Sequence, residues 1–211
     1  SGGSLQWFRN TLCETEMRRA EELGVDPYEL MGQAAEKSAV GSGGVLFLPY
    51  LLGERTPHLD SDARGVYFGL SGTTDKGDLI RAIMEGVAFS LNDALGLIGE
   101  MGITPTGVRI SGGGGRSPLW RQICADVFGV SVQTLKTTEG PALGAAILAA
   151  VGVGMYDGVP EACDAVIAPD KTQSPIAENA AKYRALYPLY RSLYQALKGE
   201  FKTLSQVRKI L

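Results

Sequence analysis

The chain has 211 residues, 45% of them hydrophobic and 20% charged, which is the balance of an ordinary globular protein with a buried core. Its formal net charge of −3 argues against a broad nucleic-acid-binding surface, and we expect no membrane span because no apolar run of about 18 residues stands out. Three scattered cysteines and one histidine lack the spacing of a zinc site, so we expect buried free thiols in a reducing, cytoplasmic compartment.

Hydrophobic periodicity and turn residues define the first half of the chain. They predict helices over 4–23 and 28–39, a strand at the start of the apolar run 45–52, a polar loop over 53–65 and a strand over 66–71. A long amphipathic helix then begins at Thr74 or Asp75 and ends near Gly102. Its apolar residues recur at spacings of three and four, which makes it the strongest helix prediction in the chain.

The second half alternates strands and helices. It predicts a strand over 107–111, a helix from Ser117–Pro118 to Gly129, a strand over 131–135, a helix over 140–154, an irregular segment over 160–175 and a helical tail from 177 that is kinked or split near Pro188. The helix over 140–154 is apolar on every side, so we expect it to be buried. Four tyrosines at helical spacing in the tail predict a docking stripe. The alternation predicts an α/β fold.

Four consecutive glycines separate the strand over 107–111 from the following helix, in the stretch VRISGGGGRSPLW over 108–120. One interpretation is a sharp turn, for which one or two glycines usually suffice. The other is a ligand site, because bare backbone and a helix N-terminus suit an anion or a nucleotide. The number of glycines favours the ligand site without excluding the turn.

Two well-known glycine motifs do not fit this stretch. No GK[ST] follows the glycines at the spacing of a phosphate-binding P-loop. The dinucleotide-binding pattern GxGxxG would need glycine at position 118, which is proline. An NAD-dependent α/β domain is therefore disfavoured.

Several stretches together resemble the C-terminal lobe of the FGGY carbohydrate kinases, especially their xylulose-kinase branch. They are SGGSLQWFRN over 1–10, LPYLLGERTPHLDSDARG over 48–65, GVYFGLSGTTDKGDLIRAIMEGVAF over 65–89, ISGGGGRSPLWRQICADVFG over 110–129 and EGPALGAAILAAVG over 139–152. The resemblance covers about residues 1–170. It implies a ribonuclease-H-like, actin-type ATPase lobe lacking its first strands, one domain over 1–211 with the tail 177–211 packed on it.

The resemblance also implies a reaction and a set of nucleotide-binding residues. The reaction is ATP-dependent phosphorylation of a sugar hydroxyl, D-xylulose in the nearest branch, with Mg²⁺. By position, Gly113 approaches the phosphates of ATP or ADP through its backbone, and Gly112 and Gly114 hold the loop. Ser117 lies at the adenine edge, where some relatives have asparagine. Gly2 and Gln6 match positions that contact the nucleotide.

The N-terminal lobe of such kinases, with the sugar pocket and the aspartate general base, has no counterpart in the sequence, so we expect a fragment with no catalytic or metal-binding residue of its own. Asp60, Asp62 and Asp75 read as solvated or capping carboxylates, and His58 as a loop contact. Glu85 without the resemblance would read as a surface charge. We therefore expect that the isolated chain does not phosphorylate sugar.

The partners implied are the N-terminal part of the same kinase and, through it, the sugar; a homodimer is left open. An open sheet edge and an exposed apolar face are expected where the first strands are lacking. The alternatives are another pentulose or polyol kinase of the family, since the sugar pocket lies elsewhere, and a non-catalytic actin-like interaction domain.

Overall fold

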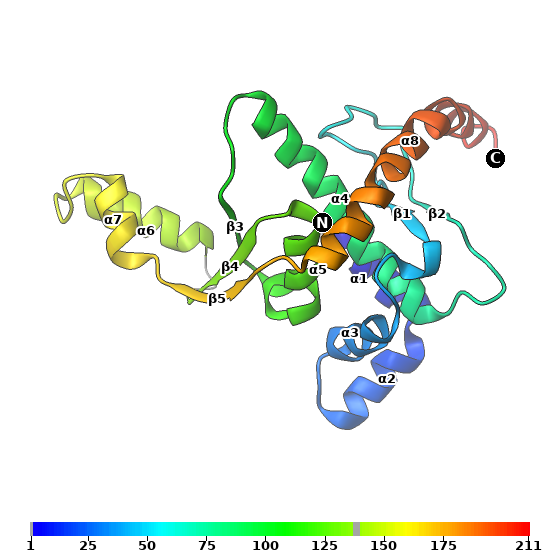
Figure 1. Ribbon diagram of the computed structural model, residues 1–211, viewed down its shortest axis with the longest axis horizontal. Coiled ribbons are helices and arrows are strands. Elements are labelled where there is room, and N and C mark those ends of the chain that lie inside the picture. The colour runs from blue at the N-terminus through cyan, green and yellow to red at the C-terminus, as the bar shows by residue number, and fades with distance from the viewer. Residues whose placement is uncertain (1, 137–139) are drawn as a thin grey trace.

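The computed structural model describes residues 2–136 and 140–211 as helices arranged around two small sheets (Figure 1). The helices are α1 Gly2–Leu12, α2 Glu14–Leu23, α3 Pro27–Lys37, α4 Lys76–Glu100, α5 Pro118–Phe128, α6 Gly140–Gly152, α7 Val159–Val166 and α8 Ala177–Val207, with short 3₁₀ turns η1 Ser42–Gly44 and η2 Gly113–Arg116. The strands are β1 Leu46–Leu48, β2 Val66–Phe68, β3 Gly107–Ile110, β4 Ser131–Leu135 and β5 Pro169–Gln173.

Helix α4 is the central element, and its start is fixed by a reciprocal cap. The Asp75 side chain accepts a hydrogen bond from the Asp78 N–H at 2.9 Å, and the Asp78 carboxylate accepts one from the Asp75 N–H at 3.1 Å. Asp75, rather than Thr74, is therefore the cap. Helices α1, α3 and α5 and strand β1 all pack against α4 (Figure 1).

Helix α4 is also long and apolar enough to cross a membrane, judged by length and composition alone. The core helix of a folded domain can pass the same test, so this finding does not overturn the expectation of no membrane span. Half of its most apolar window is buried inside the fold, as in the central helix of a folded domain. It also carries the buried ion pair between Arg81 and Glu85 at 2.7 Å.

Two separate sheets flank α4. Strands β1 and β2 form an antiparallel pair, and Leu48 is the last residue of β1, as expected from the proline that follows it. In the second sheet β4 lies between β3, to which it is parallel, and β5, to which it is antiparallel. Strand β3 pairs on one side only among the described residues, so it forms an open edge.

The Glu85 carboxylate is buried at 1% exposure, so its interpretation as a surface charge is wrong. Its oxygens accept hydrogen bonds from the Gly41 N–H at 3.0 Å, the Ser42 hydroxyl at 2.8 Å, the Arg81 Nε–H at 2.7 Å and the Tyr183 hydroxyl at 2.7 Å. These donors come from the turn before β1, from α4 itself and from α8. One buried charge therefore ties three parts of the chain together.

Helix α8 runs without interruption through Pro188, so the expected split is not found. Its tyrosines form the expected docking stripe: Tyr183 and Tyr190 are each 1% exposed and pack with Phe89 of α4. Burial of these aromatic rings holds α8 against β1, α4 and α5.

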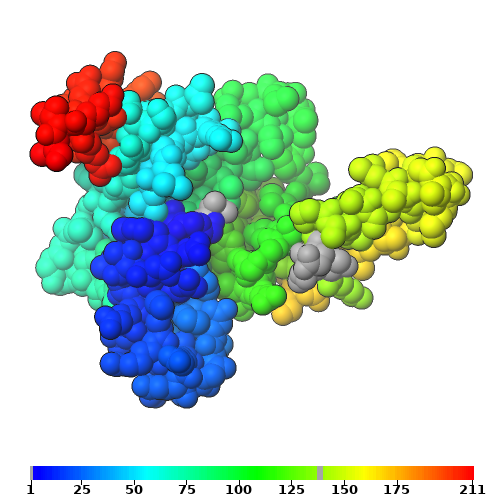
Figure 2. All heavy atoms as spheres, turned by 180° about the vertical axis from the view of Figure 1, so that it is seen from behind, coloured from blue at the N-terminus to red at the C-terminus, as the bar shows by residue number. Residues whose placement is uncertain are grey.

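Helix α6 is largely exposed, which contradicts the expectation that it is buried. Only Ile147 is buried, and Leu148 is 62% exposed. Helices α6 and α7 pack on each other and project from the rest of the molecule (Figures 1 and 2). An apolar composition favours burial but does not provide a surface to pack against. The main surface that α6 packs against is α7.

Two further local predictions are wrong. The single helix expected over 4–23 is interrupted at Cys13, giving α1 and α2. The segment expected to be irregular over 160–175 contains most of α7 and all of β5. Cys13 and Cys124 are buried free thiols as expected, whereas Cys163 is half-buried.

Substitution Glu85→Ala should lower the free energy of unfolding by about 3–5 kcal/mol, because it leaves the buried Arg81 cation without its carboxylate. Urea denaturation measures this value. The matched variant Glu100→Ala, at the exposed end of the same helix, should have little effect. Equal losses for the two variants would contradict the proposed role of Glu85.

Candidate functional site

The glycine stretch forms a tight turn between β3 and α5. Gly112 has φ 82° and ψ −174°, a backbone conformation open almost only to glycine. The 3₁₀ turn η2 follows, closed by hydrogen bonds from the Gly115 N–H to the Gly112 carbonyl and from the Ser117 N–H to the Gly114 carbonyl, each 3.1 Å. The chain thus reverses from strand to helix within a few residues.

The four glycines differ in how far the fold requires them. Gly112 supplies the unusual φ. A Cβ atom on Gly115 would lie 3.3 Å from Ile110, and one on Gly114 would lie 3.4 Å from the Trp120 ring. At Gly113 the backbone has no positive φ, and a Cβ atom would have no neighbour within 4 Å. Within the part of the chain that the structure describes, nothing therefore requires glycine at position 113.

Ser117 caps α5, as expected from the sequence. Its hydroxyl oxygen accepts a hydrogen bond from the Trp120 N–H at 3.2 Å, and Pro118 occupies the first helical position. Capping uses one lone pair of the oxygen, so the O–H of Ser117 can still donate to another group. Capping and ligand binding by the same hydroxyl are therefore compatible.

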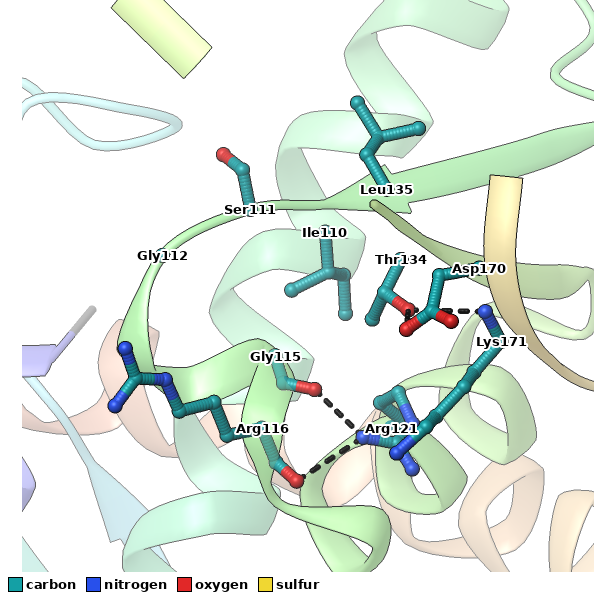
Figure 3. A pocket seen from close by; sticks show the side chains of 10 residues that line it. All are labelled: Ile110, Ser111, Gly112, Gly115, Arg116, Arg121, Thr134, Leu135, Asp170 and Lys171. Carbon is teal, nitrogen blue, oxygen red and sulfur yellow. Dashed lines mark hydrogen bonds between the residues drawn. The ribbon is translucent and has the colours of Figure 1, made fainter. Parts of the chain in front are cut away.

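A cavity of about 170 Å³ opens between the glycine turn and the ends of β4 and β5 (Figure 3). It is lined by Ile110, Ser111, Gly112, Gly115, Arg116, Arg121, Thr134, Leu135, Asp170 and Lys171. The side chains of Arg121 and Lys171 and the carboxylate of Asp170 lie near one another in it, while the Arg116 side chain points away (Figure 3). This charge favours an anionic ligand, and the volume suits only part of a nucleotide-sized molecule.

Sequence reasoning missed the wall of this cavity formed by β4 and β5. The Lys171 N–H donates to the Thr134 hydroxyl at 3.1 Å, which places Lys171 and Asp170 beside the turn although they lie more than 50 residues later. The antiparallel pairing of β4 with β5 creates this arrangement, and β5 lies in the segment 160–175 that the sequence predicts to be irregular. Arg121 was also missed, although a charged residue between Leu119 and Ile123 on an apolar helix was a visible signal.

Gly2 and Gln6 lie one turn apart on the exposed face of α1. Helix α1 and the glycine turn share no hydrogen bond or ion pair among the described residues, whereas Gly112, Gly113, Gly114 and Ser117 lie together in and beside the turn. The link between the two elements is the core: Phe8 of α1 and Ile123 of α5 belong to one buried cluster that includes α4.

The other titratable candidates have structural roles. Asp75 caps α4. Burial raises the pKa of Asp60, but hydrogen bonds from the Tyr194 hydroxyl and two backbone N–H groups outweigh that effect and lower it. His58 stacks on Tyr194 at 3.7 Å between ring centroids, and burial lowers its pKa. A carboxylate with a lowered pKa is a weaker base, so Asp60 is a poor candidate for proton abstraction.

No group of three or more His, Cys, Asp or Glu side chains is positioned to hold a metal ion within residues 2–136 and 140–211. Asp170 is the one carboxylate among the described residues that line the cavity. These residues alone do not make a site for Mg²⁺, which usually takes carboxylates together with substrate phosphates and water.

The C-terminal domain of the FGGY family of carbohydrate kinases matches residues 1–153. The chain belongs to this family. A xylulose kinase of Bacillus subtilis is 37% identical over 209 residues, which is 99% of this chain and 40% of that protein. The FGGY chain described here therefore spans about two fifths of the length of the curated relatives that it matches.

Solved structures of the family share the fold. A gluconate kinase of Lactobacillus acidophilus matches with a TM-score of 0.85 and 31% identity over 97% of this chain and 39% of that one. A glycerol kinase of Plasmodium falciparum with ADP matches with a TM-score of 0.73 and 25% identity over 93% of this chain and 37% of that one. The predicted actin-type ATPase fold is thereby confirmed for this FGGY chain.

Substitution Ser117→Ala should lower the free energy of unfolding by about 1 kcal/mol, because the Trp120 N–H loses its capping acceptor. Chemical denaturation followed by circular dichroism measures the loss. Ser61→Ala serves as the control, since the exposed Ser61 side chain makes no recorded hydrogen bond within the described residues. An unchanged stability for Ser117→Ala would exclude the capping role.

Proposed function

We propose that this chain is the nucleotide-binding C-terminal portion of an ATP-dependent sugar kinase that phosphorylates D-xylulose to D-xylulose 5-phosphate. In this proposal residues 1–211 form one lobe, with the tail 177–211 packed on it. ATP or ADP binds at the glycine turn. The family membership and the similarity to a xylulose kinase support the reaction.

The observation that carries the nucleotide site is the bare backbone at Gly113. Gly112 needs its positive φ and Gly115 has a tight contact with Ile110, whereas Gly113 has neither reason to be glycine among the described residues. A ligand that approaches the backbone closely would supply the missing reason. The related glycerol kinase structure with ADP supports a nucleotide as that ligand.

Electrostatics of the turn also favour a nucleotide. The N-terminus of α5 carries a partial positive charge and N–H groups that suit a phosphate. Arg121 and Lys171 add two formal charges at the cavity, against the single carboxylate of Asp170, and the Arg116 side chain points away from them (Figure 3). A polyphosphate chain beside Gly113 would therefore meet a positive potential.

The remaining predicted contacts complete the proposal. Ser117 donates its O–H to the adenine edge while its oxygen caps α5. Gly2 and Gln6 contact the nucleotide from α1, where both are exposed on one face. Gly112 and Gly114 hold the turn. Mg²⁺ is bound by the nucleotide phosphates together with groups outside these residues, so no step here proceeds through it.

The identity of the sugar is inferred from the relatives and from one stretch of sequence. Similarity to xylulose kinases and the stretch LLGERTPHLDSDARG over 51–65 favour D-xylulose. The high TM-score with a gluconate kinase makes gluconate the specific alternative. A non-catalytic actin-like interaction domain is the alternative outside enzymes, and it predicts no need for bare backbone at Gly113.

The proposed partner is the N-terminal part of the same kinase, which would supply the sugar pocket and the general base. Two surfaces support such a partner: the unpaired edge of β3 and the exposed apolar face of α6, with Leu148 at 62% exposure. Free cysteines at 13, 124 and 163 support a cytoplasmic location.

Substitution Gly113→Val should weaken ADP binding by at least about tenfold without lowering the midpoint of thermal unfolding. The new side chain meets no protein atom within 4 Å of its Cβ, so it blocks the ligand and not the fold. Isothermal titration calorimetry with ADP measures the affinity. Gly199→Val in α8 is the matched control, because its Cβ also meets open space. Equal affinities for the Gly113 variant and the unsubstituted chain would reject the glycine turn as the nucleotide site.

Two results are expected for the isolated chain. It should give no turnover with ATP and D-xylulose in a coupled assay. Light scattering should detect associated species rather than a monomer. The first expectation follows because the candidate carboxylates Asp75 and Asp60 serve as a helix cap and a loop anchor. The second follows from the exposed apolar face of α6. Sugar-dependent turnover would refute inactivity, and a monodisperse monomer would refute the need for a covering partner.

A further inference from the structure

Arg121 is a buried cation in an unfavourable place. The residue is only 5% exposed and lies in the first turns of α5, near the positive end of the helix dipole. It makes no ion pair within the described residues, and its buried Nε has no hydrogen-bond partner there. For stability alone, an apolar side chain of similar size would serve as well or better.

The side-chain hydrogen bonds of Arg121 among the described residues all go to the glycine turn. Its Nη1 donates to the Gly115 carbonyl at 2.6 Å and to the Arg116 carbonyl at 3.1 Å. Figure 3 shows the guanidinium group beside the turn, with both bonds directed to the end of η2. Charge-assisted bonds of this kind are stronger than neutral ones, so the end of the turn is firmly held.

The turn needs such support from outside. Glycine loses more conformational freedom on ordering than any other residue, and η2 begins with three glycines. A Cβ atom built on Gly113 would meet no neighbour within 4 Å. Order imposed before a ligand arrives lowers the entropy cost of binding it. Burying the charge of Arg121 is unfavourable for stability. Residues that are unfavourable in this way are expected mainly at functional sites.

We propose that Arg121 is a positioning residue that holds the glycine turn in its binding conformation through the carbonyls of Gly115 and Arg116. It acts on the nucleotide through the turn and does not need to touch it. The inference rests on the nucleotide binding proposed above and adds the residue that prepares the site.

Three variants test the proposal: Arg121→Met keeps the length without donors, Arg121→Lys keeps the charge and one donor group, and Arg109→Met removes an exposed arginine on β3. ADP affinity should fall about tenfold for Arg121→Met, less for Arg121→Lys, and not at all for Arg109→Met. The thermal midpoint of Arg121→Met should stay near that of the unsubstituted chain, because loss of a buried charge offsets loss of the hydrogen bonds. A purely structural role predicts a large fall in the midpoint instead.

Hydrogen exchange provides a readout that needs no ligand. The N–H groups of Gly115 and Ser117 close the turn, so their exchange should speed up in Arg121→Met and, to a smaller extent, in Arg121→Lys. Unchanged exchange at these two groups in the lysine variant and in any folded methionine variant would overturn the proposal.

The two proposals fail in different ways. If the unsubstituted chain binds ADP and Gly113→Val does not, but Arg121→Met binds within twofold of the unsubstituted chain, the positioning role is wrong and the nucleotide site stands. If the unsubstituted chain does not bind ADP, the nucleotide site is wrong for the isolated chain, and faster exchange in the Arg121 variants still supports control of the turn by Arg121.

Discussion

Convergence of four donors on the buried Glu85 carboxylate is the constraint on which the rest of the molecule depends. It joins the turn at Gly41 and Ser42, the helix α4 and the tail helix α8 at one point. A buried charge of this kind tolerates few alternative arrangements, because any other packing leaves the carboxylate or Arg81 without partners. With α4 fixed, α1 and α5 pack on it, and the two elements that carry the proposed nucleotide contacts share one core.

The glycines of the turn between β3 and α5 have different physical roles. Gly112 allows the reversal of direction, Gly115 allows close packing on β3, and Gly113 leaves backbone exposed. Ser117 caps the next helix through its hydroxyl oxygen, and its O–H can still donate to another group. Arg121 holds the end of the turn by donating to the Gly115 carbonyl. Folding thus accounts for Gly112, Gly115 and Ser117, whereas it gives no reason for glycine at position 113, which a ligand would explain.

Local signals in the sequence predicted much of this. The capped ends of α4 and α5, the strands β1 to β4 and the glycine turn follow from short-range patterns of apolar, capping and turn residues. The failures involve distant contacts. Burial of Glu85 depends on Tyr183 almost a hundred residues away, the cavity wall at Lys171 depends on the pairing of β4 with β5, and the exposure of α6 depends on which surfaces are available to cover it. Periodicity predicts which face of a helix is apolar, but not what it meets.

The central claim is that a nucleotide binds against the bare backbone of the glycine turn. Titration of ADP into the ¹⁵N-labelled chain, followed by amide NMR spectra, tests it most directly. The account predicts saturable shifts at Gly112, Gly113, Gly114 and Ser117 with the same dissociation constant, accompanied by Gln6 on α1. Saturable binding that leaves the amide signals of these four turn residues unmoved would contradict it.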